Sequence, residues 1–301
     1  EGKNPPAGVL IHYLLADDPA EGEELTLQIL DADGQVLRTF SSTTEERRAP
    51  NPWARFMPLD ESRGKLPAEA GMNRFAWDLR YPVLTPVDLS GPGEEVPWAD
   101  PDVGPWAVPG SYTVSMSRVV DGVPEEMAGP VEFQVEPLNN ATLAAADKAA
   151  LLAFQRQASE LQRDILAAAA QLGEASNQLR YMREAIRITP DLPESTLGEA
   201  RELERRIAEV RIPLSGDGSV AARQFETPAS IMGRIGNAIY ASFYATQAPS
   251  EHQRSQLRFA GEGFGEIRGE IESILADAEA LGERLQAAGA PYTPGRRGGG
   301  E

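Results

Sequence analysis

The sequence has no cysteine and only two histidines among its 301 residues. Without cysteine the chain can form no disulfide framework, no thiolate metal site and no thiol nucleophile. The absence does not identify a compartment, because many bacterial exported proteins lack cysteine. The two imidazoles, His12 and His252, lie in different predicted domains. A Ser-His-Asp site or a two-histidine metal site would therefore need the two domains to meet at these residues.

Cationic residues are also few: 28 lysines and arginines face 46 aspartates and glutamates, and the net charge is −18. A nucleic acid or an anionic membrane would have to bind against this field, so we expect neither as a partner. No apolar run approaches the roughly 20 residues of a membrane-spanning helix, so we expect no membrane insertion. The N-terminus, EGKNPPAG, lacks an initiator Met and an apolar signal region, as in a processed product or a fragment.

Hydrophobic residues make up 41% of the chain, which is enough to build real cores. The composition changes near 137-PLNNAT-142. Alternating apolar runs, most of the prolines and all four tryptophans precede this point, and Ala, Leu, Glu and Arg at helical spacing follow it. We therefore predict one domain at 1–137, a second at 138–290 and a flexible tail at 291–301.

The first half reads as short strands separated by turns. The predicted strands are 8-GVLIHYLL-15, 24-ELTLQIL-30, 35-QVLRTFS-41, 72-MNRFAWDL-79, 111-SYTVSMS-117 and 131-VEFQVE-136. Between two of them, 31-DADG-34 has the residues of a hairpin turn. The pattern predicts an antiparallel β-sandwich of the Ig-like or fibronectin-III-like kind. Two long loops rich in Pro, Gly and charge, 42–70 and 81–109, interrupt it.

Apolar residues in the second half follow a heptad seam. In the first helix they are Leu151, Phe154, Ala158, Leu161, Ile165, Ala168, Leu172, Ala175, Leu179, Met182 and Ile186. This helix, capped by Asn140 or Thr142 and ended by 189-TPDLP-193, would be about 70 Å long.

Three more helices follow in the prediction: one from Glu194 to the loop at 213–219, one over 227–247, and one that begins after Ser250. The last has its own seam: Leu257, Ala260, Phe264, Ile267, Ile271, Ile274, Ala278, Leu281 and Leu285. The expected fold class is therefore α+β multidomain, with the sandwich followed by an antiparallel bundle of three or four long helices. The loop at 213–226 leaves the number open.

The stretch 259-FAGEGFGEIRGE-270 has glycines close enough together to suggest a phosphate-binding loop. A dinucleotide fingerprint would need glycine at position 266, which is Glu266, and a preceding strand. Gly261, Gly265 and Gly269 instead repeat at i+4, and the apolar seam continues through them in phase. We interpret them as a close-packing face of a helix, with a local kink as the alternative. The candidate packing partners are Gly233, Gly236, Ala238 and the alanine run 167–170.

No catalytic, cofactor-binding or metal-ligating residue is predicted. His12 lies within a strand and His252 at the start of a helix, where an ordinary structural or solvated role is expected. Acidic pairs are abundant, but none is singled out by a defined cleft. The segment 31-DADG-34 resembles the start of a calcium loop but lacks the third acidic ligand and the distal Glu.

The four tryptophans are divided between a core and two loops. Trp77 alternates with Phe75 and is expected in the core, whereas Trp53, Trp98 and Trp106 lie in the long proline-rich loops. The loop tryptophans either pin these loops to the sandwich or form a surface for sugar stacking or protein docking, since amphipathic aromatic residues are enriched at interfaces.

Three stretches carry a recognisable pattern: 25-LTLQILDADGQVLRTFSS-42, 71-GMNRFAWDLRYP-82 and 105-PWAVPGSYTVSM-116. The pattern resembles the Ig-like domain of the flagellar hook-capping type. It resembles more closely the C-terminal region of large bacterial exported proteins whose N-terminal part is a sortilin-like or bacterial-neuraminidase-repeat β-propeller. In those proteins a long helical segment follows, with an L-x-x-x-G-x-P-Y tail, here 285-LQAAGAPY-292.

The resemblance implies an extracellular or periplasmic protein and provides no catalytic residues for this region. It also implies that a propeller, absent from this chain, was cut away, is expressed separately or remains associated.

We therefore expect a non-catalytic structural or interaction module of an exported protein, which mediates assembly or docks a protein such as a β-propeller. The candidate interaction residues are Trp53, Trp98, Trp106, Gly261, Gly265 and Gly269. One alternative is a carbohydrate-binding module that binds polysaccharide through Trp98 and Trp106. Another is a subunit of an extracellular polymer or fibre that self-associates. A hydrolase is the least expected function, and no cofactor is expected.

Overall fold

The structure is a computed structural model of the whole chain, and it describes residues 8–44, 64–86, 103–138, 144–240 and 242–295. It is mixed α+β, with antiparallel sheets and helices, as the sequence predicted. The chain divides into two compact units. Unit 1 is Glu1–Val83, Val87–Arg156 and Ala241–Ala248, and unit 2 is Leu84–Pro86, Gln157–Tyr240 and Pro249–Glu301.

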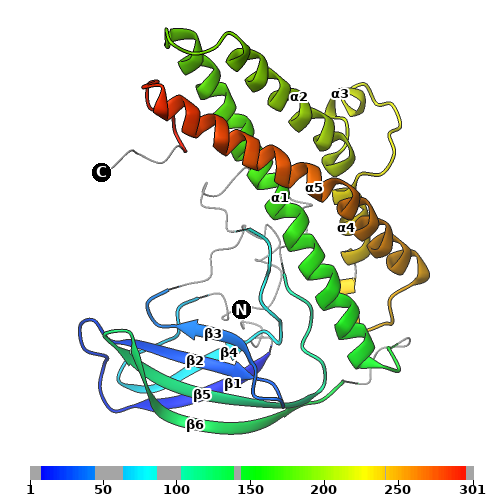
Figure 1. Cartoon of the computed structure of the whole chain (residues 1–301). Coiled ribbons are helices and arrows are strands. Elements are labelled where there is room, and N and C mark those ends of the chain that lie inside the picture. Colours follow the sequence, from blue (N-terminus) through cyan, green and yellow to red (C-terminus); the bar gives the residue numbers. More distant parts are fainter. Residues whose placement is uncertain (1–7, 45–63, 87–102, 139–143, 241, 296–301) are drawn as a thin grey trace. The chain divides into compact units, whose positions relative to one another are not determined.

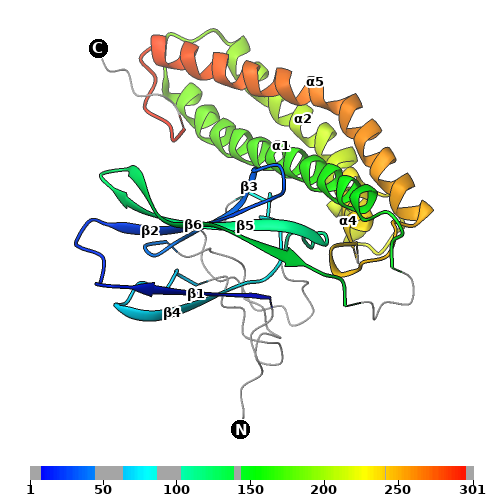
Figure 2. The same cartoon turned by 90° about the horizontal axis from the view of Figure 1, so that it is seen from below.

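The described part of unit 1 contains six strands, each of which overlaps a predicted one. They are β1 (Val9–Leu15), β2 (Glu24–Leu30), β3 (Val36–Ser41), β4 (Gly71–Trp77), β5 (Gly110–Val120) and β6 (Val123–Val135). A four-stranded sheet has the order β3-β2-β5-β6, and β1 pairs with β4 in a two-stranded sheet. Figure 2 shows β1 and β4 as a separate layer beside the larger sheet.

The predicted turn after β2 is present. The amide of Gly34 donates to the carbonyl of Asp31, and Gly34 has a φ of 77°, which glycine tolerates without strain. The side chain of Asp31 accepts hydrogen bonds from the amides of Asp33 and Gln35. The turn is therefore fixed by Asp31 and Gly34, the residue types on which its prediction rested.

Both sheets contribute to one hydrophobic cluster. Its largest fully buried members include Trp77 and Phe75 from β4 and Leu25, Leu27 and Ile29 from β2. The alternation of buried and half-buried residues along β2 explains why the sequence predicts this strand so well, because successive side chains point to opposite faces.

The hairpin of β5 and β6 is longer than predicted. Strands were expected at 111–117 and 131–136, but they continue toward each other and meet at Asp121 and Gly122. These two residues have φ values of 52° and 80°, as a two-residue type I′ turn requires. The prediction missed the extension because β6 is exposed along most of its length and shows no alternation.

Five helices follow the strands in the described part of the chain. They are α1 (Lys148–Ile188), α2 (Ser195–Ser215), α3 (Gly218–Ala221), α4 (Ile231–Ile239) and α5 (Glu251–Ala287). The first turn of α1 is capped by Asp147, whose side chain accepts a hydrogen bond from the amide of Ala150 at 2.9 Å. The caps predicted at Asn140 and Thr142 lie outside the described residues.

The apolar seam of α5 is confirmed. The predicted seam residues are buried except for Ile267, which is half-buried. Ser250 begins the helix with a capping box, in which its side chain and that of Gln253 bond reciprocally to the backbone. Residues 259–270 lie within this continuous helix, so the interpretation as helix rather than phosphate-binding loop is correct.

Two predicted helix boundaries were wrong. The helix expected over 227–247 is only α4, because Tyr240 takes an extended conformation (φ −49°, ψ 133°) and a 3-10 turn follows at Ser242–Tyr244. The second helix was expected to end before Pro213, but α2 continues to Ser215. Pro213 therefore lies inside the last turn of α2, where it has no amide hydrogen for the helical hydrogen bond at that position.

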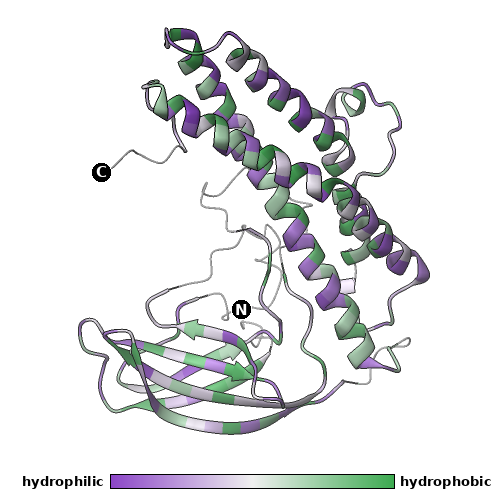
Figure 3. Cartoon of the chain, in the orientation of Figure 1, coloured by the Kyte–Doolittle hydropathy of each residue, from purple (hydrophilic) through white to green (hydrophobic). Residues whose placement is uncertain are grey.

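Side-chain contacts within unit 2 give the directions of the long helices. Arg183 of α1 contacts Glu204 of α2, and Arg211 of α2 donates to the carbonyl of Leu172, so these helices run antiparallel. Polar and apolar residues alternate along all of them (Figure 3). No described helix is long and apolar enough to cross a membrane.

Candidate functional site

Neither histidine is part of a catalytic or metal-binding arrangement in the described residues. His12 is exposed on β1 opposite Arg74, and His252 is exposed in the first turn of α5, in the other unit. No ion pair or hydrogen bond joins either imidazole to a described carboxylate. The described ranges also contain no group of three or more His, Asp or Glu residues that could hold a metal ion.

The most elaborate polar site in unit 1 is built around Arg80, which is only 7% exposed. Its guanidinium donates to the carbonyl of Gly104 at 2.7 Å and to that of Phe243 at 2.9 Å. It also lies 3.8 Å from the ring centroid of Trp106 and 5.4 Å from that of Tyr244. A buried cation is thus surrounded by carbonyl dipoles and aromatic faces, which attract positive charge.

Backbone contacts reinforce this Arg80 site. Arg80 and Trp106 form an isolated β-bridge. On either side of it, the amide of Tyr81 donates to Pro105 at 3.0 Å and the amide of Ala107 donates to Leu79 at 2.7 Å. The segment that follows β4 is therefore paired with the end of the second long loop.

The segment 242–246, which begins with the 3-10 turn Ser242–Tyr244, is held in the same region. Gln155 donates to the carbonyl of Ser242 at 2.7 Å, and the amide of Ala145 donates to the carbonyl of Thr246 at 2.7 Å. Nearby, Arg156 bonds the hydroxyl of Tyr81 at 3.1 Å and lies over its ring. Residues that follow α4 in sequence are therefore part of unit 1 through specific hydrogen bonds.

Of the three loop tryptophans, only Trp106 lies in the described residues; Trp53 and Trp98 lie outside them. The ring of Trp106 is half-buried and one face is covered by Arg80. Of the two roles considered for Trp106, this contact favours pinning the loop, because a sugar-stacking residue needs a free ring face. Sequence reasoning missed Arg80, although this residue ends the G-x-N-x-F-x-W-D-x-R pattern that carried the family resemblance.

That pattern has a structural explanation in unit 1. Asn73 is buried and donates to the carbonyls of Glu69 and Gly71. The indole nitrogen of Trp77 donates to the carbonyl of Arg80 at 3.3 Å, and the side chain of Asp78 accepts from the amide of Arg80 at 3.1 Å. The motif therefore fixes the backbone of the residues that follow β4, and this backbone positions the Arg80 guanidinium.

The glycine stripe of α5 does not pack as predicted. A Cβ built on Gly265 or Gly269 would meet no described atom within 4 Å outside the adjoining backbone of its own helix, and both residues are exposed. At Gly261 it would make an ordinary contact with Leu161, 3.7 Å away. The close approach is instead at Gly263, where a Cβ would lie 3.2 Å from Ile231. The predicted packing partners Gly233 and Gly236 meet none of the stripe glycines.

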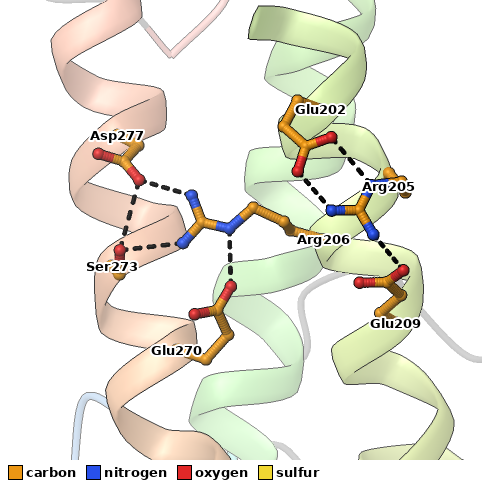
Figure 4. A network of polar contacts seen from close by, with 7 residues as sticks. All are labelled: Glu202, Arg205, Arg206, Glu209, Glu270, Ser273 and Asp277. Carbon is orange, nitrogen blue, oxygen red and sulfur yellow. Dashed lines mark hydrogen bonds and ion pairs between the residues drawn. The ribbon is translucent and has the colours of Figure 1, made fainter.

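An ion network joins α2 to α5 (Figure 4). Arg206 reaches from α2 to Glu270 and Asp277, each at 2.7 Å, and to Ser273 at 2.9 Å. Among the described residues, Arg205, one residue away, pairs only with Glu202 and Glu209 of its own helix. Hydrogen bonds to Glu270 and Asp277 raise the pKa of Arg206, and the hydrogen bond from Arg205 lowers the pKa of Glu202.

An open groove of about 690 Å³ runs between α1 and α5. Its apolar lining includes Ala175, Met182 and Ala278, and Glu174 and Glu279 are acidic residues beside them. The groove is also lined by the amide side chains of Gln171, Gln178 and Gln286 and by no histidine, so its chemistry is that of a surface for polar, cationic or apolar side chains.

Comparison with known proteins adds no relative: no family model, no curated protein and no solved structure matches this chain.

Proposed function

We propose that this chain is a non-catalytic interaction module of an exported protein and that the exposed face of α5 docks a partner protein. The observation that carries the proposal is the position of Gly265 and Gly269 inside a continuous helix, where no described residue packs against the space that a side chain would fill. Each glycine costs the helix about 1 kcal/mol relative to alanine. A partner backbone could approach the helix closely where these glycines have no Cβ, and the contact would offset their cost in helix stability.

The proposed fold of unit 1 is an Ig-like sandwich. If β1 to β6 are taken as strands B, C, C′, E, F and G, the order β3-β2-β5-β6 corresponds to the C′CFG sheet and β1-β4 to the BE pair. The hydroxyl of Tyr112, at the start of β5, donates to the carbonyl of Val108 at 2.6 Å. A tyrosine that bonds back to the backbone at this strand is a recurrent feature of Ig-like domains.

The proposed fold of unit 2 is a bundle in which α2 runs antiparallel to both α1 and α5. Its support is the seam of buried aliphatic residues on α2 and α5, together with the contacts of Arg183 with Glu204 and of Arg206 with α5. A β-propeller as the partner, and export from the cell, rest on the sequence resemblance alone.

The carbohydrate-binding alternative is not favoured by any described contact, because Arg80 covers a face of Trp106. No group of described residues forms an arrangement to which a catalytic step could be assigned. Self-assembly, the remaining alternative, is developed below.

The test is site-specific photo-cross-linking in the cells that naturally produce the protein. A photoreactive residue replaces Arg268, which is exposed between Gly265 and Gly269, and a control places it at Arg201 on α2. We expect a discrete adduct from position 268 only. The adduct should weaken when Gly265 and Gly269 are both changed to Ala, because each then carries a Cβ, and disappear when both are changed to Leu. Equal adducts from both positions, or indifference to the leucines, would refute docking at this face.

A further inference from the structure

An exposed basic and aromatic patch lies on α4 and α5. Phe259 is 41% exposed, and the guanidinium carbons of Arg234 and Arg258 lie 5.2 Å and 4.9 Å from its ring centroid. Arg254, one turn before Arg258, is also exposed. We call these four residues the arginine–phenylalanine patch. An exposed phenylalanine between two cations is suited to an apolar ligand that carries negative charge.

The charges of this patch are poorly neutralised by the chain itself. Arg258 approaches Glu262 at 4.0 Å, with both side chains exposed, which is a weak pair. No described carboxylate forms an ion pair with Arg234 or Arg254. Between Thr227 and Gly261 the sequence holds three arginines and only one carboxylate, Glu251, in a chain of net charge −18. The patch is therefore locally basic, although the chain as a whole is acidic.

The hairpin of β5 and β6 presents the opposite chemistry. Its tip, residues 121–127, is exposed throughout, with Val123 62% and Met127 47% accessible. Glu126 and Asp121 make no ion pair with a described residue, whereas Glu125 contacts Arg118 at 3.3 Å. We call this segment the hairpin tip. The exposed apolar side chains of the hairpin tip are complementary to Phe259 of the patch, and its carboxylates are complementary to the arginines of the patch.

The hairpin tip is not built to add a strand to a sheet. Pro124 and Pro130 lie on β6, at the edge of the sheet, and neither has an amide hydrogen to donate. The register also shifts around Met116, where Met127 is the extra residue of a bulge. Prolines and bulges protect an edge against backbone pairing. Contacts of the tip are therefore made by side chains.

We propose that copies of this chain associate head to tail, with the hairpin tip of one copy on the arginine–phenylalanine patch of the next. Glu126 and Asp121 face the arginines, and Met127 packs on Phe259, as thioethers do favourably on aromatic rings. The two surfaces differ, so the contact is heterologous and produces rings or open chains. This inference rests on the proposed interaction role and names a second copy as the partner.

The experiment is sedimentation velocity of the full chain at increasing concentration, up to about 1 mM, where weak contacts become populated. The wild type should associate at about 50 mM salt and largely dissociate at about 500 mM, because exposed charges are screened. Glu126→Arg alone and Arg258→Glu alone should each weaken association about tenfold or more, because each places like charges in contact. The double variant, with both charges exchanged, should recover most of the loss.

Matched controls carry the same charge changes on an exposed part of α1: Glu174→Arg and Arg180→Glu. They should leave association within about threefold of wild type. A wild type that stays monomeric overturns the inference but not the proposed function, which the cross-linking experiment tests separately. Association that resists both single reversals but is lost with leucines at Gly265 and Gly269 also overturns it, and supports docking at the glycine face. Failure of the double variant to recover refutes the pairing of these two surfaces.

Discussion

Arg80 in unit 1 and Arg206 in unit 2 join distant parts of the chain in different ways. Arg80 is buried and bonds to backbone carbonyls and aromatic faces, whereas the side chain of Arg206 is 21% exposed and pairs with carboxylates. A buried cation resists salt but is costly to leave without partners. An exposed pair contributes less and is screened by ions. The two units should therefore respond differently to mutation, salt and pH.

The largest effect is expected for Arg80→Met, which leaves the carbonyls of Gly104 and Phe243 without their donor. Unfolding of unit 1 should become easier by about 2–4 kcal/mol, with little change on adding salt. Denaturant titration followed by tryptophan fluorescence would measure this, since all four tryptophans precede α1 in sequence. Arg80→Lys keeps the charge but not the geometry and should recover only part of the loss. A loss under 1 kcal/mol would contradict a central role for this side chain.

A gain in stability is expected for Gly269→Ala, by about 0.5–1 kcal/mol, because the new methyl group meets no other atom and the helix gains propensity. The matched control is Gly263→Ala, whose Cβ would lie 3.2 Å from Ile231 and which should gain less or lose. Thermal unfolding followed by circular dichroism at 222 nm compares the two. Equal gains would show that the packing at Gly263 is loose.

A smaller loss is expected for Arg206→Gln, about 0.5–1 kcal/mol, because exposed ion pairs contribute little individually. The difference from wild type should shrink as salt is raised. Arg205→Gln is the control, since Arg205 pairs only within α2, and it should cost about half as much. If both substitutions cost the same at every salt concentration, the link between α2 and α5 contributes nothing beyond helix propensity.

The smallest effect concerns acid. The hydrogen bond from Arg205 lowers the pKa of Glu202 in the folded chain, so its contribution to stability is complete above the unfolded-state pKa and is lost as pH falls through the folded value. Glu202→Gln should therefore differ from wild type at neutral pH and match it in strong acid. Unfolding titrations from about pH 7 to about pH 2.5 would detect this. A difference that grows toward low pH would have the wrong sign.

Sequence patterns predicted elements best where one face is buried. The seam of α5 and the alternation of β2 repeat with the periods of a helix and a strand, and both elements lie where they were expected. The exposed extension of β6 has no such period. The one sequence signal for its turn is the pair Asp121-Gly122, a residue combination typical of two-residue hairpin turns. The predicted helix at 227–247 was too long because residues beyond Tyr240 bond to unit 1, a contact that local propensity does not encode.

The candidate sites were harder to anticipate. Arg80 is one arginine among many in the sequence, and its burial depends on Gly104 and Phe243, which are far from it along the chain. Gly265 and Gly263 are two residues apart in one helix, yet only Gly263 faces a close neighbour. Helical spacing identifies a stripe, but the partner of that stripe depends on tertiary packing.

The hydrogen bond from Arg80 to Phe243 joins residues 163 positions apart. During synthesis from the N-terminus, the strands of unit 1 leave the ribosome long before Phe243 is made, and α1, α2 and α4 are translated in between. The Arg80 guanidinium therefore lacks its partner at Phe243 until α1, α2 and α4 have been translated. Closing so distant a contact is entropically slow, so completion of unit 1 belongs to the last stage of folding.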